Sequence, residues 1–187
     1  MAATTTQPTS TTTWNIEPGH SLVEFSAKHM MITTVKGRFR DVTGAINIDE
    51  ANPERSTVEA SMNAATIDTG VAQRDQHLVS PDFLDAATYP TITFKSRKIS
   101  GARASAGDEF TITGDLTIRG TTREVTLTAS YEGRGKDPWG GERISFTASG
   151  KIDRRDFGLT WNQALEAGGI LVSNDIKINL EVQAVRA

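Results

Sequence analysis

The sequence contains no cysteine, and its 187 residues include no long apolar run. The absence of cysteine excludes disulfide bonds, thiolate metal sites and cysteine nucleophiles. No stretch approaches the roughly 18 consecutive apolar residues of a membrane-spanning helix. Basic residues are not in excess either, because 20 Lys and Arg stand against 23 Asp and Glu. This balance disfavours a nucleic acid as the partner, since no basic surface is available for the phosphates.

The length and composition are those of one folded domain, with 37% apolar residues, 16 glycines and 6 prolines. We expect this domain to cover residues 14–187. The preceding Thr-rich segment, MAATTTQPTSTTT over residues 1–13, is expected to be a disordered tail. It has neither the cationic nor the apolar region of a secretory signal. We therefore expect a cytoplasmic location, with a periplasmic or secreted location as the alternative if a leader has been removed.

From Ser21 onward, apolar and polar residues alternate with a period of two, which is typical of antiparallel strands with one buried face. Eight long segments show this pattern, and they cover residues 21–29, 35–49, 56–66, 91–100, 110–119, 125–131, 143–153 and 176–182. The short segment 14–16 could add an edge strand. Within 35–49 the apolar phase shifts by one residue, so a bulge or sharp bend is predicted near Arg40.

One segment departs from the strand pattern. Residues 71–84, VAQRDQHLVSPDFL, place Val71, Leu78 and Val79 at helical spacing, with Pro81 as a stop signal. Eight antiparallel strands with one short helical insertion leave unpaired edges unless the sheet closes. The sequence therefore predicts an all-β fold, an eight-stranded antiparallel barrel, with a β-sandwich as the alternative.

The rows of residues expected to face the barrel interior contain small side chains near the middle of several strands. These residues are Ala60, Ala64, Gly114, Ala129, Ala148 and Gly150. An eight-stranded barrel either is filled by its side chains or holds one small ligand, and small inward residues favour an elongated apolar pore. The alternative is a solid barrel, in which large residues such as Phe25, Phe39, Phe94 and Phe146 interdigitate with the small ones.

Few residues are candidates for polar contacts or chemistry. His29 has the same strand parity as Phe25, so its ring could face the pore. Arg74 and His77 are three residues apart, and on a helix they would offer two donors to a ligand head group. Alternatively, Arg74 and Asp75 fix the helix to the barrel rim, together with Arg154, Arg155 or Asp156. The spacing of the three histidines matches no metal-ligand motif, so we expect no metal and no catalytic residue.

Several motifs resemble the YceI-like family, and they follow one another in order over residues 14–185. They are WNIEPGHSLVEFSAKHM (14–30), GRFRDVTGAINID (37–49), ATIDTGVAQRDQHLVSPDFLDAATYPTITFKS (65–96), GDLTIRGTTREVTL (114–127) and KIDRRDFGL (151–159). The resemblance implies a lipocalin-like barrel that holds a polyisoprenoid or related long-chain lipid in its pore. This agrees with the pore that the small inward residues predict.

Together these observations predict a carrier that sequesters a long-chain lipid, such as a polyisoprenoid, an isoprenoid quinone or a fatty-acyl compound. Apart from this lipid we expect no cofactor, and a homodimer is left open. The predicted ligand-binding residues are Phe25, His29, Phe39, Arg74, His77, Phe83, Phe94, Phe146 and Trp161. Two alternatives remain: a lipid-modifying enzyme with His29 or His77 as general base, or a structural or stress-response interaction protein with a filled barrel.

Overall fold

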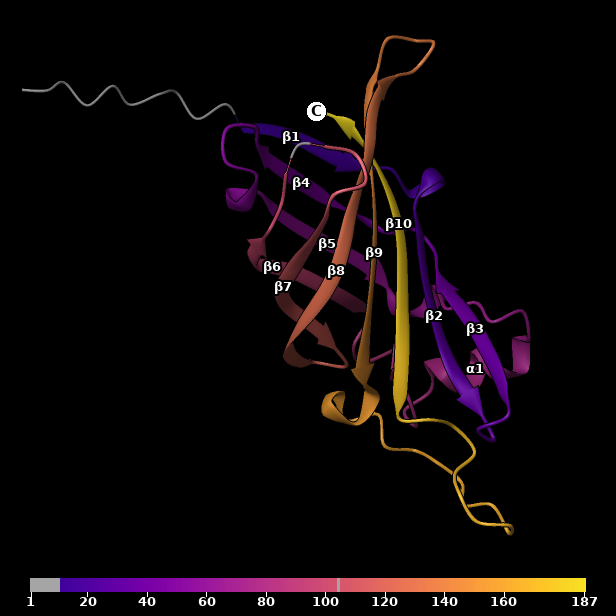
Figure 1. Ribbon diagram of the computed structural model, residues 1–187. Coiled ribbons are helices and arrows are strands. Elements are labelled where there is room, and N and C mark those ends of the chain that lie inside the picture. The colour runs from indigo at the N-terminus through magenta and orange to yellow at the C-terminus, as the bar shows by residue number, and fades with distance from the viewer. Residues whose placement is uncertain (1–10, 104) are drawn as a thin grey trace, which may run out of the picture.

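The computed structural model describes residues 11–103 and 105–187 and is built mainly from β-strands (Figure 1). The strands in the described residues are β1 (Thr11–Ile16), β2 (Leu22–His29), β3 (Thr33–Phe39), β4 (Thr43–Asp49), β5 (Thr57–Asn63), β6 (Thr91–Ser100), β7 (Glu109–Ile118), β8 (Thr121–Lys136), β9 (Glu142–Asp153) and β10 (Asp175–Arg186). The helical elements are α1 (Ala72–Val79) and the short 3-10 helices η1 (Pro18–His20), η2 (Pro53–Arg55), η3 (Ala64–Thr66) and η4 (Arg154–Phe157).

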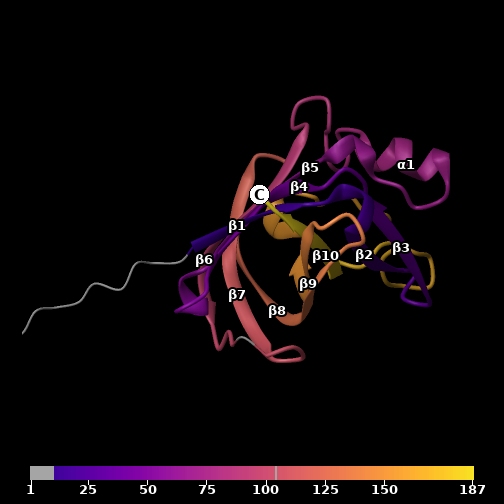
Figure 2. The same cartoon turned by 90° about the horizontal axis from the view of Figure 1, so that it is seen from above.

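The sheet closes into the predicted eight-stranded antiparallel barrel. The strands pair in the order β1, β4, β5, β6, β7, β8, β9, β10, and β10 pairs again with β1 through Ala184 to Arg186. Seen from above, the strands form a ring and α1 lies outside it (Figure 2). Closure satisfies the backbone groups that an open sheet would leave unpaired at its edges.

The first strand differs from its prediction. We expected residues 14–16 at an edge, but β1 starts at Thr11 and pairs with both β4 and β10. Residues 11–13, predicted as part of the tail, therefore belong to the barrel wall. Residues 1–10 of the predicted tail lie outside the described residues. The sequence pattern missed residues 11–13 because all three are threonines, which show no alternation of apolar and polar side chains.

The predicted interruption near Arg40 is present, but it divides the segment into two strands. β3 ends at Phe39, Asp41 adopts a φ of 58°, and β4 begins at Thr43. β3 pairs with β2, whereas β4 pairs with β1 and β5. β2 in turn pairs with β10 from Lys177 to Glu181. β2 and β3 thus extend the wall beside the lower half of β10.

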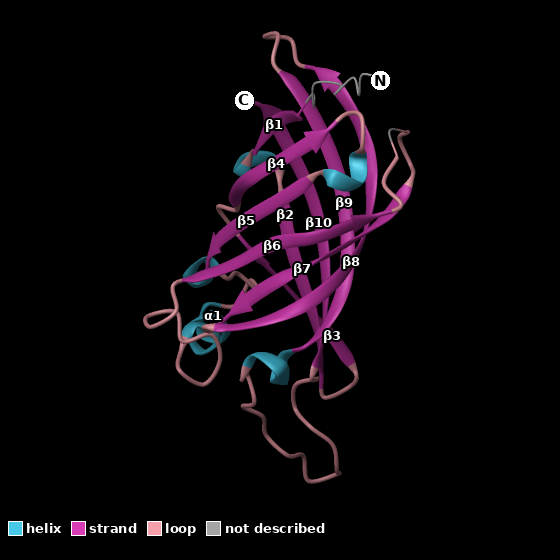
Figure 3. Ribbon diagram, turned by 90° about the vertical axis from the view of Figure 1, so that its left-hand side faces the viewer, coloured by secondary structure: helices cyan, strands magenta, loops and turns pink. Residues whose placement is uncertain are grey.

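The predicted helix over 71–84 is shorter in the structure. α1 ends at Val79, and Ser80 is extended with φ −72° and ψ 169°. Pro81 explains this end, because a proline disfavours the helical conformation of the residue before it. In the view of Figure 3, α1, η4 and the loop after η4 lie at the lower end of the barrel, and the β8–β9 hairpin projects at the upper end.

Candidate functional site

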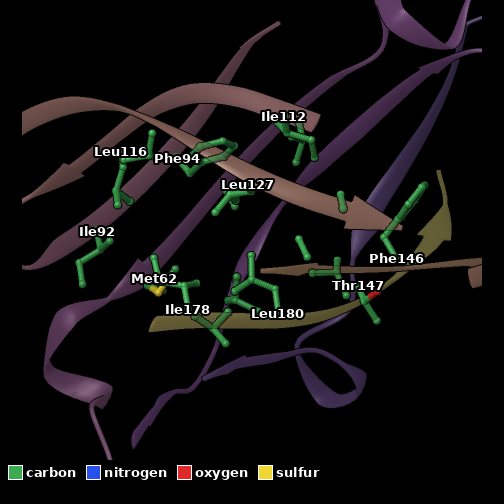
Figure 4. A pocket seen from close by; sticks show the side chains of 18 of the residues that line it. Met62, Ile92, Phe94, Ile112, Leu116, Leu127, Phe146, Thr147, Ile178 and Leu180 are labelled. Atoms are coloured by element: carbon green, nitrogen blue, oxygen red, sulfur yellow. The ribbon is translucent and has the colours of Figure 1, made fainter. Parts of the chain in front are cut away.

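The interior of the barrel contains a cavity of about 460 Å³, which lies within the range of small-molecule sites, roughly 300 to 1,000 Å³. Figure 4 shows side chains from β5, β6, β7, β8, β9 and β10 pointing toward one another into this space. The labelled lining residues are Met62, Ile92, Phe94, Ile112, Leu116, Leu127, Phe146, Thr147, Ile178 and Leu180. Nearly all are apolar, because each strand turns its apolar row inward. The barrel is therefore hollow and not solid.

Small residues keep this space open, as the sequence predicted. Ala60, Ala129 and Ala148 line the cavity. Gly114 has a different role, because a Cβ atom there would lie 2.6 Å from the Phe94 ring. The missing side chain lets that ring lie close against the neighbouring strand. Gly37 does the same for Phe25, whose ring would be 2.4 Å from a Cβ.

Five of the aromatic lining residues form two separate groups. The rings of Phe25 and Phe39 are 5.6 Å apart. The ring of Phe146 lies 5.5 Å from that of Tyr131 and 6.3 Å from that of Phe110. These spacings are typical of favourable aromatic pairs.

The two ends of the cavity differ in exposure. At the upper end the cavity is bordered by the exposed residues Glu50, Thr57 and Arg103, which we call the mouth. Five of the residues that line the lower end are buried, and we call this set the floor: Ile67, Phe83, Leu84, Arg154 and Phe157. The elements that carry the floor are η4, the turn after η3 and the segment after α1. The cavity thus has one polar, accessible end and one closed end.

Five of the nine predicted ligand-binding residues line the cavity: Phe25, Phe39, Phe83, Phe94 and Phe146. The other four do not. His29 is exposed at the lower end of β2, where its backbone pairs with Val172. The role of the nine predicted residues as ligand contacts stays a prediction.

His77 and Trp161 lie close together next to the floor but outside the cavity lining. The His77 ring packs edge-on against Trp161 at 4.7 Å and against Phe83 at 5.0 Å. Its Nε2 lies 2.8 Å from a carboxylate oxygen of Asp82. These contacts hold the segment after α1 against the loop after η4. Neither His29 nor His77 is among the residues that line the cavity.

Arg74 contacts the chain itself and not the cavity. Its Nε donates to Thr69 Oγ1 at 2.7 Å and its Nη2 to the Thr69 carbonyl at 2.8 Å. Asp75 accepts from the backbone N–H and the hydroxyl of the same Thr69. Arg74 and Asp75 therefore fix α1 to Thr69 in the turn that precedes it. The hydrogen bonds described for them do not reach Arg154, Arg155 or Asp156, the partners proposed for an anchor at the barrel rim.

Asp68 joins β3 to the segment that leads into α1. Its carboxylate accepts from Arg40 at 2.6 Å, from the Gly70 N–H at 2.9 Å and from Arg38 at 3.2 Å. These hydrogen bonds favour the ionised form, so the pKa of Asp68 falls to about 2. The backbones of Arg38 and Asp68 also pair. This contact closes the wall where β3 has no strand partner on its outer side.

Arg154 is the charged residue of the floor, and the sequence interpretation did not assign it to the ligand. It was considered only as an anchor for the helix. The signal was present, because Arg154 continues the alternate row of Ile144, Phe146 and Ile152 past the end of β9. An arginine rarely occupies a position in an otherwise apolar, inward-facing row.

Two further findings concern the described residues only. No group of three or more His, Asp or Glu side chains among them could hold a metal ion. Among the same residues, no helix has the length and apolarity to cross a membrane.

Comparison with known proteins shows which family this barrel resembles. The YceI-like domain model matches residues 14–184. The chain is 43% identical to Protein YceI of Escherichia coli O157:H7 over 143 residues, which is 76% of this chain and 73% of that protein. The crystal structure of Campylobacter jejuni YCEI protein superposes with a TM-score of 0.72 at 34% identity, covering 86% of this chain and 90% of that one.

A more distant structure shares the fold. The polyisoprenoid binding domain from Saccharophagus degradans superposes with a TM-score of 0.68 at 13% identity, over 93% of this chain and 98% of that one. The family model spans nearly the whole barrel, and the resemblance of the sequence motifs is thereby confirmed. The chain belongs to the YceI-like family.

Proposed function

We propose that this protein binds a long-chain apolar molecule of the polyisoprenoid, isoprenoid quinone or fatty-acyl class inside its barrel and carries it through water. The observation that carries the proposal is the apolar cavity, which runs from the mouth to the buried floor. A chain of linked methyl and methylene groups matches such a space better than a compact polar metabolite. The polyisoprenoid binding domain named above has the same fold, which supports this ligand class.

The driving force in this proposal is desolvation of the ligand chain. Each buried methylene group contributes about 0.8 kcal/mol. Ten such groups give about 8 kcal/mol, which corresponds to micromolar affinity before the costs of association. Contacts of the polar end with the protein then select among ligands of equal chain length.

Native mass spectrometry tests the proposal directly. The protein, purified without detergent and then delipidated, is mixed with geranylgeraniol, a neutral isoprenoid of four units. We expect a complex of one protein and one geranylgeraniol, which disappears when the protein is unfolded. Absence of a complex with geranylgeraniol and with dodecan-1-ol would contradict the proposal. A short peptide or a sugar in the same experiment serves as the negative control.

A further inference from the structure

Arg154 is a buried cation at the closed end of an apolar cavity. It is the first residue of η4, its exposed fraction is 4%, and it lines the cavity. Its floor neighbours are aliphatic and aromatic side chains, among them Phe83 and Phe157. Arginine is almost never fully buried unless it is paired, so its partners decide what this residue does.

Backbone carbonyls hold part of the guanidinium. Nε donates to the Ser173 carbonyl at 3.0 Å, and Nη1 donates to the carbonyls of Leu159 at 2.7 Å and Trp161 at 2.8 Å. Nη2 is buried and has no hydrogen-bond partner among the described residues. The three carbonyls fix the orientation of the planar group, and therefore the position of the free nitrogen.

The positive charge of Arg154 has no anionic partner in the described part of the chain. None of the ion pairs there includes Arg154. The adjacent carboxylate, Asp153, is occupied by Arg155, which donates from Nε at 3.0 Å and from Nη2 at 2.5 Å. A buried donor without a partner costs free energy, and a buried charge without a counter-ion costs more.

Burial lowers the pKa of the Arg154 guanidinium, because a low-dielectric environment disfavours its charged form; the charge of Asp153 opposes this effect and that of Arg155 adds to it. Arginine nevertheless stays protonated in proteins. The floor therefore carries a positive charge and a free donor at neutral pH. Both would be satisfied by the same kind of group, an anionic oxygen.

We propose that the floor binds the anionic head of a long-chain lipid, a carboxylate or a phosphate, through Nη2 of Arg154. This deepens the proposed function and rests on it. The ligand then lies with its head at the closed end and its tail toward the mouth. The apolar floor residues exclude water from the pair, and low polarity strengthens the attraction. A neutral chain leaves Nη2 unpaired, and a cationic head is repelled.

A head-group series on the unaltered protein tests this assignment. Dodecanoic acid, dodecyl phosphate, dodecan-1-ol and dodecyltrimethylammonium are compared by isothermal titration calorimetry at pH 8 and at concentrations below micelle formation. We expect at least one anion to bind roughly tenfold or more tightly than the alcohol, because charged hydrogen bonds are the stronger ones. The ammonium compound should bind most weakly. Preference for one anion distinguishes a carboxylate from a phosphate head.

The series separates the two proposals. If the alcohol and the ammonium compound bind as tightly as both anions, the head-group assignment is wrong while the barrel still binds lipid. If geranylgeraniol and all four dodecyl compounds fail to bind, the proposed function itself is wrong.

A pair of variants then assigns the preference to one residue. Arg154→Gln removes the free donor and the charge. We expect this variant to bind the anion and the alcohol with about equal affinity. Arg155→Gln, on the same element but with a side chain that is 57% exposed, makes the same change of charge and should keep the preference. Equal loss in both variants would overturn the assignment to Arg154.

Because Arg154→Gln also removes three hydrogen bonds to the chain, a measurement on the unaltered protein is needed beside it. In amide NMR spectra, stearic acid with a spin label at carbon 5 should broaden signals of the floor, such as that of Phe157. The label at carbon 16 should broaden signals near the mouth, such as that of Ala102. The reverse pattern would show the ligand tail-first and would overturn the proposal.

Discussion

Ala148 offers the most direct way to test whether the guest occupies the barrel. It lies in the middle of β9, opposite Leu180 of β10 and Ala129 of β8, and lines the cavity. Ala148→Leu adds three carbon atoms to this wall. Because these atoms take the space of about three methylene groups of the guest, we expect a loss of about 2.4 kcal/mol of binding free energy. This corresponds to roughly 50-fold weaker binding.

The assay is the fluorescence titration of cis-parinaric acid, an 18-carbon probe whose emission rises in apolar surroundings. The matched control is Ser149→Leu, which introduces the same side chain one residue further along β9, at an exposed position. We expect this control to keep the affinity of the unaltered protein.

Stability provides a second readout for the same pair of variants. Without ligand, Ala148→Leu fills apolar space and should raise the free energy of unfolding, by at most about 2 kcal/mol, in urea denaturation. Weaker binding in a protein that is equally or more stable cannot be attributed to unfolding. Unchanged affinity in Ala148→Leu, or an equal loss in Ser149→Leu, would refute the placement of the guest inside the barrel.

Three further predictions follow from individual contacts. Gly114→Ala forces the new Cβ against the Lys95 carbonyl and the Phe94 ring; we expect a loss of about 1 to 3 kcal/mol of stability in urea and weaker binding of cis-parinaric acid. Because the pKa of Asp68 is lowered to about 2, its contribution to stability is present above the pKa of the unfolded chain, about 3.8, and is lost as the pH falls toward about 2. The difference in melting temperature between the unaltered protein and Asp68→Asn should shrink over this pH window. A constant difference would contradict the role of the charge. Asp75→Ala removes both acceptor contacts to Thr69, and hydrogen exchange of the α1 amides should become faster with a cost of about 1 to 3 kcal/mol.

Much of the fold could be predicted from the sequence because its signal is local. Alternation with a period of two decides which face of a strand is apolar, and it needs no knowledge of the partner strand. The same pattern predicted the hollow interior, since Ala129 and Ala148 occupy inward positions in the middle of long strands. Phe25, Phe39, Phe94 and Phe146 of the predicted site line the cavity for this reason, whereas Phe83 lies in the segment after α1.

The sequence did not predict the elements whose position depends on distant contacts. β1 closes the barrel by pairing with β10, about 170 residues further along the chain, and the three threonines at its start show no alternation of apolar and polar side chains. The contact between His77 of α1 and Trp161 of the loop after η4 is also a distant one, and the sequence did not predict it. Their surroundings are set by tertiary contacts and not by local spacing.

The sequence by itself determined the family, the strand faces and the apolar character of the interior, because these follow from residue types at fixed spacing. Only the tertiary structure decided which end of the cavity is closed and what lies there. Arg154 reaches the floor because the carbonyls of Ser173, Leu159 and Trp161 converge on its guanidinium. That convergence requires the loop after η4 to fold back below the barrel. The sequence does not reveal it, because the backbone carbonyl has the same chemistry at every position.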